Sequence, residues 1–486
     1  MSARQTLGAF LHNRRRPGAP LATVLHTPST LRQPTEALLS PTPRSLKRAL
    51  RPGQLCLIAA LLIACVFAPQ SLAAAHDRGQ SLATVIATER AHSRAQTTDP
   101  GIQLGLAFDF DSAAAASIGR DVSYVFGGYF LDWKFGFYPS GPELDGFIPF
   151  DLDPYPPSEP GNSLSAWQNA HPDWVIYKCN GTTPAYFGSG NSNVPLDFSN
   201  PAVRTWQVQQ AALLLKAGAT GIAVDDFNFT NYAGRCGVYR NGIWWELGYP
   251  RRGWIDDRYT TDMVTWLADF SAQLKQEFPT TTIAVNMSPS ESGLRDVQTV
   301  TPYIDTDFDE AGFTGEGAQN LSGPAWLQEV KALQYLNQHG KAVDVNGIVD
   351  ASSERAVTSA QVNWILGNYL LVKGKRTYTY IYAGNHGGYA RSPSGYGSFY
   401  DRRAYHAPIG YATSPIVRYN GVYARGYSGG MTIVNPSATE TQTVPLGGTY
   451  IDMFGRRYTS VTLGPTSAIV LLRSRSQRTR AVKPVG

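Results

Sequence analysis

The chain has 486 residues, of which 43% are hydrophobic and 12% aromatic, so it is too apolar to be disordered and long enough for two or three domains with full cores. Its formal net charge of +5 comes from its ends: residues 1–54 carry +8 and residues 473–486 carry +5, which leaves −8 on the body between them. An acidic body argues against binding of a nucleic-acid backbone by the folded part of the chain.

The N-terminal region has the order of a secretory signal. Two arginines precede the apolar run 55–67, and the small residues 73–75 follow it. Because this run is shorter than the roughly 20 residues that a membrane-spanning helix needs, we expect a secreted or periplasmic protein without a membrane span. Residues 62–65 also have the pattern of a bacterial lipobox, and a lipid anchor at Cys65 is the alternative.

From about residue 100, short apolar runs alternate with amphipathic segments, the pattern of alternating strands and helices. Asn200 and Pro201 form the start of one predicted helix, and apolar stripes over 263–278 and 326–336 predict two more. Eight strands with intervening helices predict an α/β fold, a (β/α)8 TIM barrel over residues 100–409. The eight predicted strands are 104–109, 122–126, 174–178, 221–226, 282–286, 305–310, 342–346 and 378–382.

The remaining segments differ from this pattern. After residue 410 the sequence consists of short alternating runs separated by Gly and Pro, which predicts a small antiparallel β-sandwich domain at 410–472. The other predicted segments are a basic extension with the signal peptide at 1–75, a linker at 76–99 and a basic flexible tail at 473–486.

Cysteine and histidine usage bears on disulfides and metals. Two of the four cysteines lie in the predicted signal, which leaves Cys179 and Cys236 in the exported chain. In an oxidising compartment we expect these two to form a disulfide that ties the loops after the third and fourth strands. The six histidines from residue 76 onward have no metal-ligand spacing, and no glycine-rich nucleotide-binding motif follows a strand, so we expect no metal centre and no cofactor.

Polar residues follow several of the predicted strands. Side chains alternate along a strand, and since Ile222 and Val224 suit the helix-covered face, Asp225 points into the barrel mouth and Asp226 points away. The same parity directs Asp109, Asn286, Asp344 and Asn346 inward. Four strands thus deliver Asp or Asn to the C-terminal end of the barrel, where barrel active sites are found.

The sixth predicted strand carries four acidic residues, and its parity is open. If Glu310 follows Thr306 and Phe308 inward, it faces Asp225 across the fifth strand. Glycoside hydrolysis needs two such carboxyl groups, one ionised and one protonated. The alternative for this segment is a solvated acidic loop.

Four stretches, LDFSNPAVR, GATGIAVDDF, NMSP and DTDFDEAGF, resemble bacterial glycoside hydrolases of the barrel type, in particular hypothetical glycosyl hydrolase family 15, which is unrelated to the similarly named glucoamylases. The resemblance extends from about residue 100 to 472. It implies that Asp225 is the catalytic Asp of the fourth strand and Glu310 the catalytic Glu of the sixth. Because Asp226 and Asp309 lie directly beside them, these neighbours are the alternative pair.

Together these patterns predict an exported glycoside hydrolase that cleaves a poly- or oligosaccharide, with Asp225 as nucleophile or base and Glu310 as general acid. The alternative is a barrel that binds polysaccharide without catalysis. Aromatic residues in the loops after the second and fourth strands provide faces on which sugar rings stack. The predicted substrate-binding residues are Asp109, Asp111, Trp133, Lys178, Asp226, Trp244, Asn286, Asp344, Asn346, Asn385 and His386.

Overall fold

The computed structural model describes residues 80–92, 101–107, 122–128, 143–149, 163–186, 194–249, 255–315, 319–384 and 400–474. These residues all belong to one compact unit, residues 69–486. No helix in these described ranges is long and apolar enough to cross a membrane. The predicted signal peptide, the lipobox at Cys65 and the basic tail from 475 onward lie outside them.

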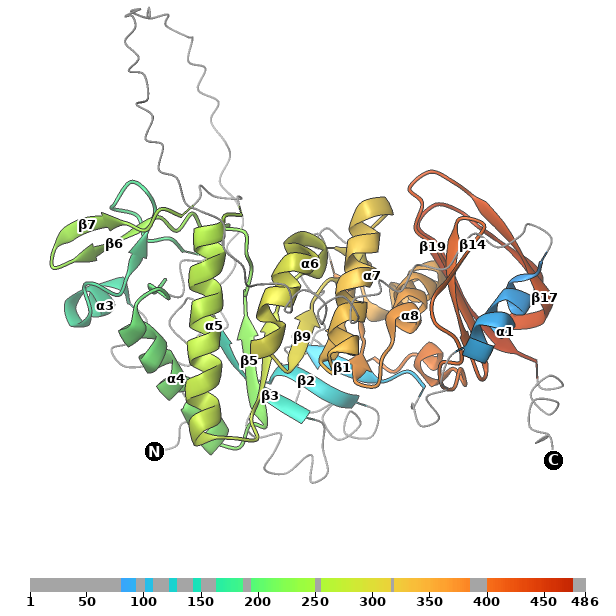
Figure 1. Cartoon of the computed structure of the whole chain (residues 1–486), viewed down its shortest axis with the longest axis horizontal. Helices are drawn as coiled ribbons and strands as arrows, with labels where there is room; N and C mark the ends of the chain where they lie inside the picture. The colour runs from blue at the N-terminus through green and yellow to red at the C-terminus, as the bar shows by residue number, and fades with distance from the viewer. Residues whose placement is uncertain are drawn as a thin grey trace, which may run out of the picture. The chain divides into compact units, whose positions relative to one another are not determined.

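The central element is a sheet of eight parallel strands, in the order β1-β2-β3-β5-β8-β9-β10-β12. Figure 1 labels β1, β2, β3, β5 and β9 of this sheet. The first and last strands are also connected, because Leu104 forms a parallel bridge with Thr379 and the Gly105 N–H donates to the Thr379 carbonyl at 3.3 Å. The strands are β1 Leu104–Ala107, β2 Val122–Gly128, β3 Glu143–Pro149, β5 Gly221–Asp225, β8 Thr282–Asn286, β9 Thr306–Asp309, β10 Ala342–Val345 and β12 Thr377–Tyr378.

The third strand of this sheet is not the one that the sequence predicted. Residues 174–178 contribute β4 (Ile176–Tyr177), which pairs antiparallel in a separate sheet with β6 (Gly237–Arg240) and β7 (Ile243–Glu246). The place in the parallel sheet is taken by β3, which contains Gly146 and Pro149. Both residue types are depleted in strands, so the sequence pattern did not predict a strand here. An apolar run as short as 174–178 predicts a strand but does not show which other strand it pairs with.

The predicted strands at 342–346 and 378–382 are each longer and interrupted. Beyond β10 and β12 the chain forms a second parallel pair, β11 (Gly347–Asp350) with β13 (Ile381–Gly384). This pair extends the same end of the sheet at which the polar residues of β5, β8 and β9 lie.

Helices follow the signals that their sequences contain. The predicted start at Asn200 is confirmed, since its side chain accepts from the Ala202 N–H and Pro201 opens the helix. The Thr358 and Gln361 side chains form a capping box in the same way. The α-helices are α1 Leu82–His92, α3 Leu164–Ala170, α4 Pro201–Lys216, α5 Asp257–Glu277, α6 Pro289–Val300, α7 Gly323–Gln338 and α8 Ser359–Val372. Short 3₁₀ helices are η4 Thr301–Tyr303, η5 Gly312–Thr314, η6 Glu354–Ala356 and η7 Arg403–His406.

The C-terminal part is one six-stranded antiparallel sheet, ordered β14-β15-β16-β19-β17-β18, and not the two-sheet sandwich that we expected. Helix α8 packs on it through Gly367, whose carbonyl accepts from the Thr432 hydroxyl at 2.8 Å. Helix α1, which lies within the expected linker, packs on it through Leu82 and Val85. Helices α1 and α8 thus pack on this sheet in the place that a second sheet would occupy in a sandwich. Its strands are β14 Val417–Tyr419, β15 Val422–Tyr427, β16 Gly430–Asn435, β17 Gln442–Asp452, β18 Arg457–Leu463 and β19 Ser467–Arg473.

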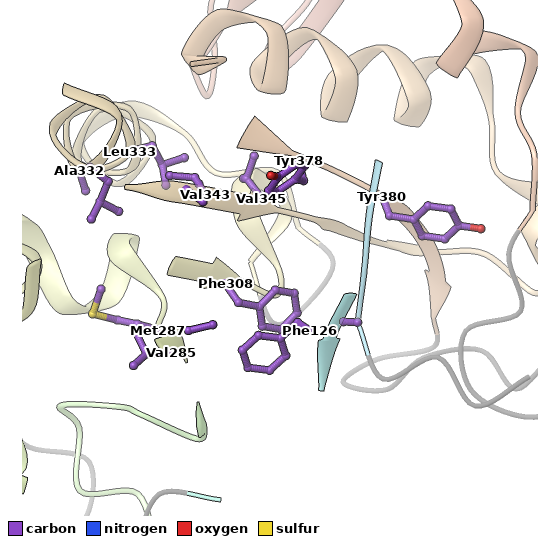
Figure 2. Close-up of a cluster of buried hydrophobic side chains, with 14 of the residues drawn as sticks. Phe126, Val285, Met287, Phe308, Ala332, Leu333, Val343, Val345, Tyr378 and Tyr380 are labelled. Carbon is purple, nitrogen blue, oxygen red and sulfur yellow. The ribbon is translucent and has the colours of Figure 1, made fainter. Parts of the chain in front are cut away.

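Aromatic side chains fill the inner side of the parallel sheet. The rings of Phe126 and Phe308 stack with centroids 4.2 Å apart, and Figure 2 shows them face to face. On the opposite face of the sheet, Val343 of β10 lies beside Leu333 of α7 in the same figure. Phe308 therefore marks the inward parity of β9, and its neighbours in sequence face the helix layer.

Close packing of β1 against β10 makes a specific prediction. A Cβ at Gly105 would lie 2.4 Å from Oδ1 of Asp344, a side chain that is itself fully buried. We expect Gly105→Ala to lower the free energy of unfolding by about 1–3 kcal/mol, because the interior is already filled. Gly464→Ala is the matched control, since nothing lies within 4 Å of its added methyl group. Equal stability of the two variants in denaturant titrations would contradict this packing.

Candidate active site

Two carboxyl groups and one amide meet at the ends of three neighbouring strands. Nδ2 of Asn286, at the end of β8, donates to Oδ1 of Asp225 and to Oε2 of Glu310, each at 2.8 Å. A side-chain amide nitrogen has two N–H groups, so one can serve each carboxyl group. Two oxygens bound to the same nitrogen lie no further apart than twice that distance. The structure thus brings together Asp225 and Glu310.

The strands explain this convergence. In β5, Ile222 and Val224 are fully buried, and Asp225 ends the strand. In β9, Phe308 points to the inner side, and Glu310 has the same parity. Asp225, Asn286 and Glu310 are all half-buried, whereas the residue directly before each of them is buried. The three polar groups therefore lie where the filled interior ends and solvent begins.

Burial is the main influence on the ionisation of Asp225. Although its side chain keeps partial contact with solvent, the surrounding protein raises the pKa of Asp225 to about 7, and the charge of Glu310 acts in the same direction. The Asn286 side chain and the Asp226 backbone N–H oppose this rise by binding the carboxylate form. Near neutral pH, Asp225 therefore exchanges its proton readily.

Asp226 lies directly after β5 in an unusual backbone conformation. Its φ is 57°, in the left-handed region, and its carbonyl accepts from the Asn228 N–H at 2.8 Å. Aspartate adopts this region more easily than most residues, because its short side chain bonds locally. The reversal turns the chain sharply away from the strand immediately after Asp225.

Asp344 and Asn346 lie on β10 and just beyond it, and both are buried. Burial raises the pKa of Asp344 well above its usual range, and the nearby Asn346 side chain acts against this rise. Neither oxygen of Asp344 and neither amide atom of Asn346 has a hydrogen bond of normal geometry within the described part of the chain. The Asn346 N–H donates to the Asp309 carbonyl at 3.0 Å, which places Asn346 next to the β9 terminus that leads to Glu310.

Two other predicted ligands belong to the small antiparallel sheet. Lys178 follows β4, and its backbone N–H donates to the Thr183 carbonyl at 2.8 Å. The Trp244 ring packs edge-on against Tyr239 and covers Gly237, so it forms part of that layer. Its neighbour Trp245 is 52% exposed and lies under the Arg240 guanidinium. Asp109, Asp111, Trp133, Asn385 and His386 lie outside the described residues.

The disulfide between Cys179 and Cys236 is confirmed, with Cα atoms 5.0 Å apart. The Cys236 N–H donates to the Tyr177 carbonyl at 2.9 Å, so the bond links the end of β4 to the segment that enters β6. It therefore ties the chain on both sides of the segment that carries Asp225.

Removal of this disulfide should cost stability. The bond closes a loop of 57 residues, for which loss of chain entropy in the unfolded state corresponds to roughly 4 kcal/mol. We expect the double variant Cys179→Ser, Cys236→Ser to unfold at lower denaturant concentration than the oxidised protein, and to be insensitive to reductant. A wild-type protein whose unfolding midpoint did not change on reduction would contradict this expectation.

Asp307, Asp309 and Glu329 are fully buried between β9 and α7. The two aspartates were recognised in the sequence as acidic residues of the sixth predicted strand, but Glu329 and the grouping of the three were not predicted. A signal was available for Glu329, because it lies three residues after Trp326 and one before Val330, on the buried face of a helix. Within the ranges that the structure describes, no group of His, Cys, Asp and Glu is arranged to hold a metal ion.

Comparison with known proteins gives one match to a family. The sequence model of a family described as hypothetical glycosyl hydrolase family 15 matches residues 152–431. No curated protein matches.

Similar solved structures include three glycoside-active proteins. The glycoside hydrolase domain of PelA from Pseudomonas aeruginosa is 15% identical, with 59% of this chain and 95% of that chain covered and a TM-score of 0.36. Eubacterium rectale Amy13B is 12% identical, with 80% and 99% covered and a TM-score of 0.40. The debranching enzyme of Nostoc punctiforme is 13% identical, with 76% and 85% covered and a TM-score of 0.40.

Proposed function

Because the chain belongs to hypothetical glycosyl hydrolase family 15 and is thus a glycoside hydrolase, we propose that it is exported and cleaves a poly- or oligosaccharide with Asp225 and Glu310 as its catalytic pair. The observation that carries this proposal is the Asn286 amide that binds both carboxyl groups. An amide in this position holds two acidic side chains at a fixed separation across a space that solvent reaches.

The proposed roles follow from the environments of the two groups. Since burial raises the pKa of Asp225 to about 7, Asp225 is the group that holds a proton near neutral pH. We therefore assign the general acid to Asp225 and the nucleophile to Glu310, the reverse of the roles that the sequence analysis gave them. The sequence alone could not assign these two roles, because both residues are carboxylic acids and only their surroundings distinguish them.

The separation of the pair favours retention of configuration. Retaining enzymes have carboxyl groups about 5–5.5 Å apart, and inverting enzymes about 6.5–9.5 Å apart. The facing oxygens of Asp225 and Glu310 share one nitrogen at 2.8 Å each and thus lie closer together than inverting enzymes require.

In the proposed reaction, the Asp225 proton passes to the glycosidic oxygen while a Glu310 oxygen bonds to the anomeric carbon and the C–O bond to the leaving sugar breaks. Water then gives a proton to Asp225 and its oxygen displaces Glu310 from the anomeric carbon. Each carboxyl group ends in the state in which it began.

Asn346 is the strongest candidate for a hydroxyl ligand. It is 1% exposed, and its recorded side-chain contact in the described part of the structure, with Asp344, lacks normal hydrogen-bond geometry. A buried amide without well-formed hydrogen bonds is costly unless a ligand supplies them, and sugar hydroxyl groups both donate and accept. We propose the remaining predicted ligands, including Asp109, Asn385 and His386, because carboxylate, amide and imidazole groups form hydrogen bonds with sugar hydroxyl groups.

We also propose that the eight parallel strands close into a (β/α)8 barrel. The Leu104–Thr379 bridge between the two outermost strands supports closure. Export is supported by the disulfide, because such bonds persist mainly in oxidising compartments.

The experiment that tests the function uses the purified protein and panels of bacterial and plant polysaccharides. We expect new reducing ends from at least one polymer. The anomeric configuration of the first product, measured by NMR, should be the same as that of the substrate. Tight binding of a polysaccharide without any release of sugar would favour the alternative, a barrel that binds without catalysis. An inverted first product would retain the pair but reject the nucleophilic role of Glu310.

A further inference from the structure

Three carboxyl side chains that the proposed mechanism does not use lie buried behind the candidate site. Asp307 and Asp309 point to the helix layer because Phe308, between them, points to the inner side of the sheet. Glu329 of α7 approaches them from the opposite side, and all three side chains have no exposed surface. Such a cluster in an apolar layer cannot be fully ionised.

Among the described residues, the interactions recorded for these groups include no balancing cation. Burial raises the pKa of Asp309 to about 6 and holds the pKa values of Asp307 and Glu329 well above their usual ranges. None of the interactions that the structure records for these three described residues involves Lys, Arg or His. The groups that face them are the Ser290 N–H and Glu291 of α6, the Gly312 N–H, Glu310 and Asp344.

A proton shared between Glu329 and Asp309 would give these two carboxyl groups a hydrogen bond to each other. If both were ionised, the only donor recorded toward Glu329 among the described residues would be the Ser290 N–H, and Oδ2 of Asp309 would have no donor in hydrogen-bond geometry. The two side chains nevertheless lie within interaction distance, so a single shared proton makes one a donor and the other an acceptor. Oδ1 of Asp309 is occupied separately, since it accepts from the Gly312 N–H at 3.0 Å.

This contact acts on both segments that form the candidate site. Asp309 directly precedes Glu310, and the turn that follows is tight, because a Cβ at Gly312 would lie 2.3 Å from the Asn346 carbonyl. The Ser290 N–H, which also faces Glu329, lies four residues after Asn286. One side chain on α7 thus contacts the segment after β8 and the segment after β9.

We propose that Glu329 is a positioning residue that shares a proton with Asp309 and thereby holds Glu310 against Asn286. This inference rests on the proposed catalytic role of Glu310. Glu329 itself does not touch the space in which a sugar would react, so its effect passes through Asp309 and the turn at Gly312.

Two replacements of nearly equal volume separate hydrogen bonding from packing. Gln at position 329 can still donate one hydrogen bond to Asp309, whereas Met cannot. We expect Glu329→Met to lower kcat by about tenfold or more, since small misplacements of reacting groups cost up to about 100-fold, with KM within about twofold of the wild type. We expect Glu329→Gln to keep kcat within about threefold. Asp307→Asn is the matched control, a buried carboxyl group on the same strand, and should leave kcat unchanged.

A readout without substrate distinguishes failure of this inference from failure of the proposed function. The side-chain N–H resonances of Asn286, observed by NMR in the free protein, should shift in Glu329→Met and remain in place in Glu329→Gln and Asp307→Asn. This result is expected even if no glycan is cleaved. Unchanged Asn286 resonances and unchanged kcat in Glu329→Met would overturn the proposal and leave Glu329 with a role in packing alone.

A second measurement serves if Glu329→Met does not fold. The infrared carbonyl band of protonated carboxyl groups should weaken in Glu329→Gln relative to the wild type at neutral pH, because the shared proton is lost. An unchanged band would mean that no proton lies between Glu329 and Asp309, and the proposal would be wrong.

Discussion

Replacement of Glu310 by Gln should reduce kcat on every glycoside by at least about a thousandfold, because an amide cannot attack the anomeric carbon as a carboxylate does. Asp225→Asn should reduce kcat on natural glycans by about 10²–10⁴-fold, the usual contribution of a general acid. On aryl glycosides with activated leaving groups the loss in kcat/KM should be much smaller, since these groups depart without a proton, while kcat should stay low because hydrolysis of the glycosyl enzyme still lacks its base. Thermal unfolding of both variants should stay near that of the wild type, because each replacement conserves volume.

The proposed role of Asp225 also predicts the direction in which activity changes with pH. The general acid must be protonated, so activity should fall as pH rises through about 7, the pKa to which burial raises Asp225. For activated aryl glycosides, Asp225→Asn should lose this alkaline fall. Added azide should restore turnover of Asp225→Asn and give a glycosyl azide of retained configuration, because azide attacks the glycosyl enzyme without a base.

Matched controls are available on the surface. Asp257 and Glu277 are exposed and bind only Arg295 and Lys216 in the recorded ion pairs, so Asp257→Asn and Glu277→Gln should leave kcat unchanged. If azide instead rescued Glu310→Gln with retained configuration and Asp225→Asn with inverted configuration, the roles of the pair would revert to those inferred from the sequence. If both site variants kept wild-type activity, the pair would not be catalytic.

Local patterns in the sequence predicted the parts of the site that depend on strand periodicity. Alternation of Ile222 and Val224 with small residues directed Asp225 inward, and the structure has Asp225 at the end of β5 with Asn286 bound to it. The inward parity of Glu310 was open from sequence alone, because Asp and Glu alternate with few apolar residues in that strand. The stack of Phe308 on Phe126 decides it, and this contact joins residues far apart in the chain.

Features that depend on partners distant in sequence could not be predicted. Strand β3 contains Gly146 and Pro149, and only its neighbours β2 and β5 reveal it as a strand. The C-terminal strands have the short alternating runs of a sandwich, but helices α1 and α8 supply the covering layers. The raised pKa of Asp225 depends on burial, which no spacing of residues in the sequence encodes.

The buried carboxyl groups also lead to a large expected effect on stability. The pKa of Asp225 rises to about 7 and that of Asp309 to about 6, and those of Asp307, Asp344 and Glu329 lie well above their usual ranges, with burial as the largest cause in each case. Each folded-state pKa thus exceeds the unfolded value, which is 3.8 for Asp and 4.5 for Glu. Between the two values the unfolded chain releases a proton that the folded chain keeps.

Stability should therefore decrease as pH rises, because the folded state binds more protons than the unfolded state over this range. Each such group contributes a slope of about 1.4 kcal/mol per pH unit, from about pH 4 up to its folded-state pKa. For Asp225 that window ends near pH 7 and for Asp309 near pH 6, and the raised pKa values of the other three groups act in the same direction. We expect the free energy of unfolding, measured in denaturant, to be several kcal/mol greater at pH 5 than at pH 8.

A single substitution tests the cause of this decrease. Asp344→Asn replaces a buried neutral acid by a neutral amide of the same shape, so the folded state changes little while one titrating group is lost. Its slope against pH should be smaller than that of the wild type by about 1.4 kcal/mol per pH unit, which makes the variant the more stable protein at pH 8. Asp257→Asn, an exposed carboxylate, should leave the slope unchanged. A wild-type stability that is constant or increases from pH 5 to pH 8 would mean that these carboxyl groups are ionised in the folded protein, and the neutral, proton-sharing state argued for Asp309 and Glu329 would fail with it.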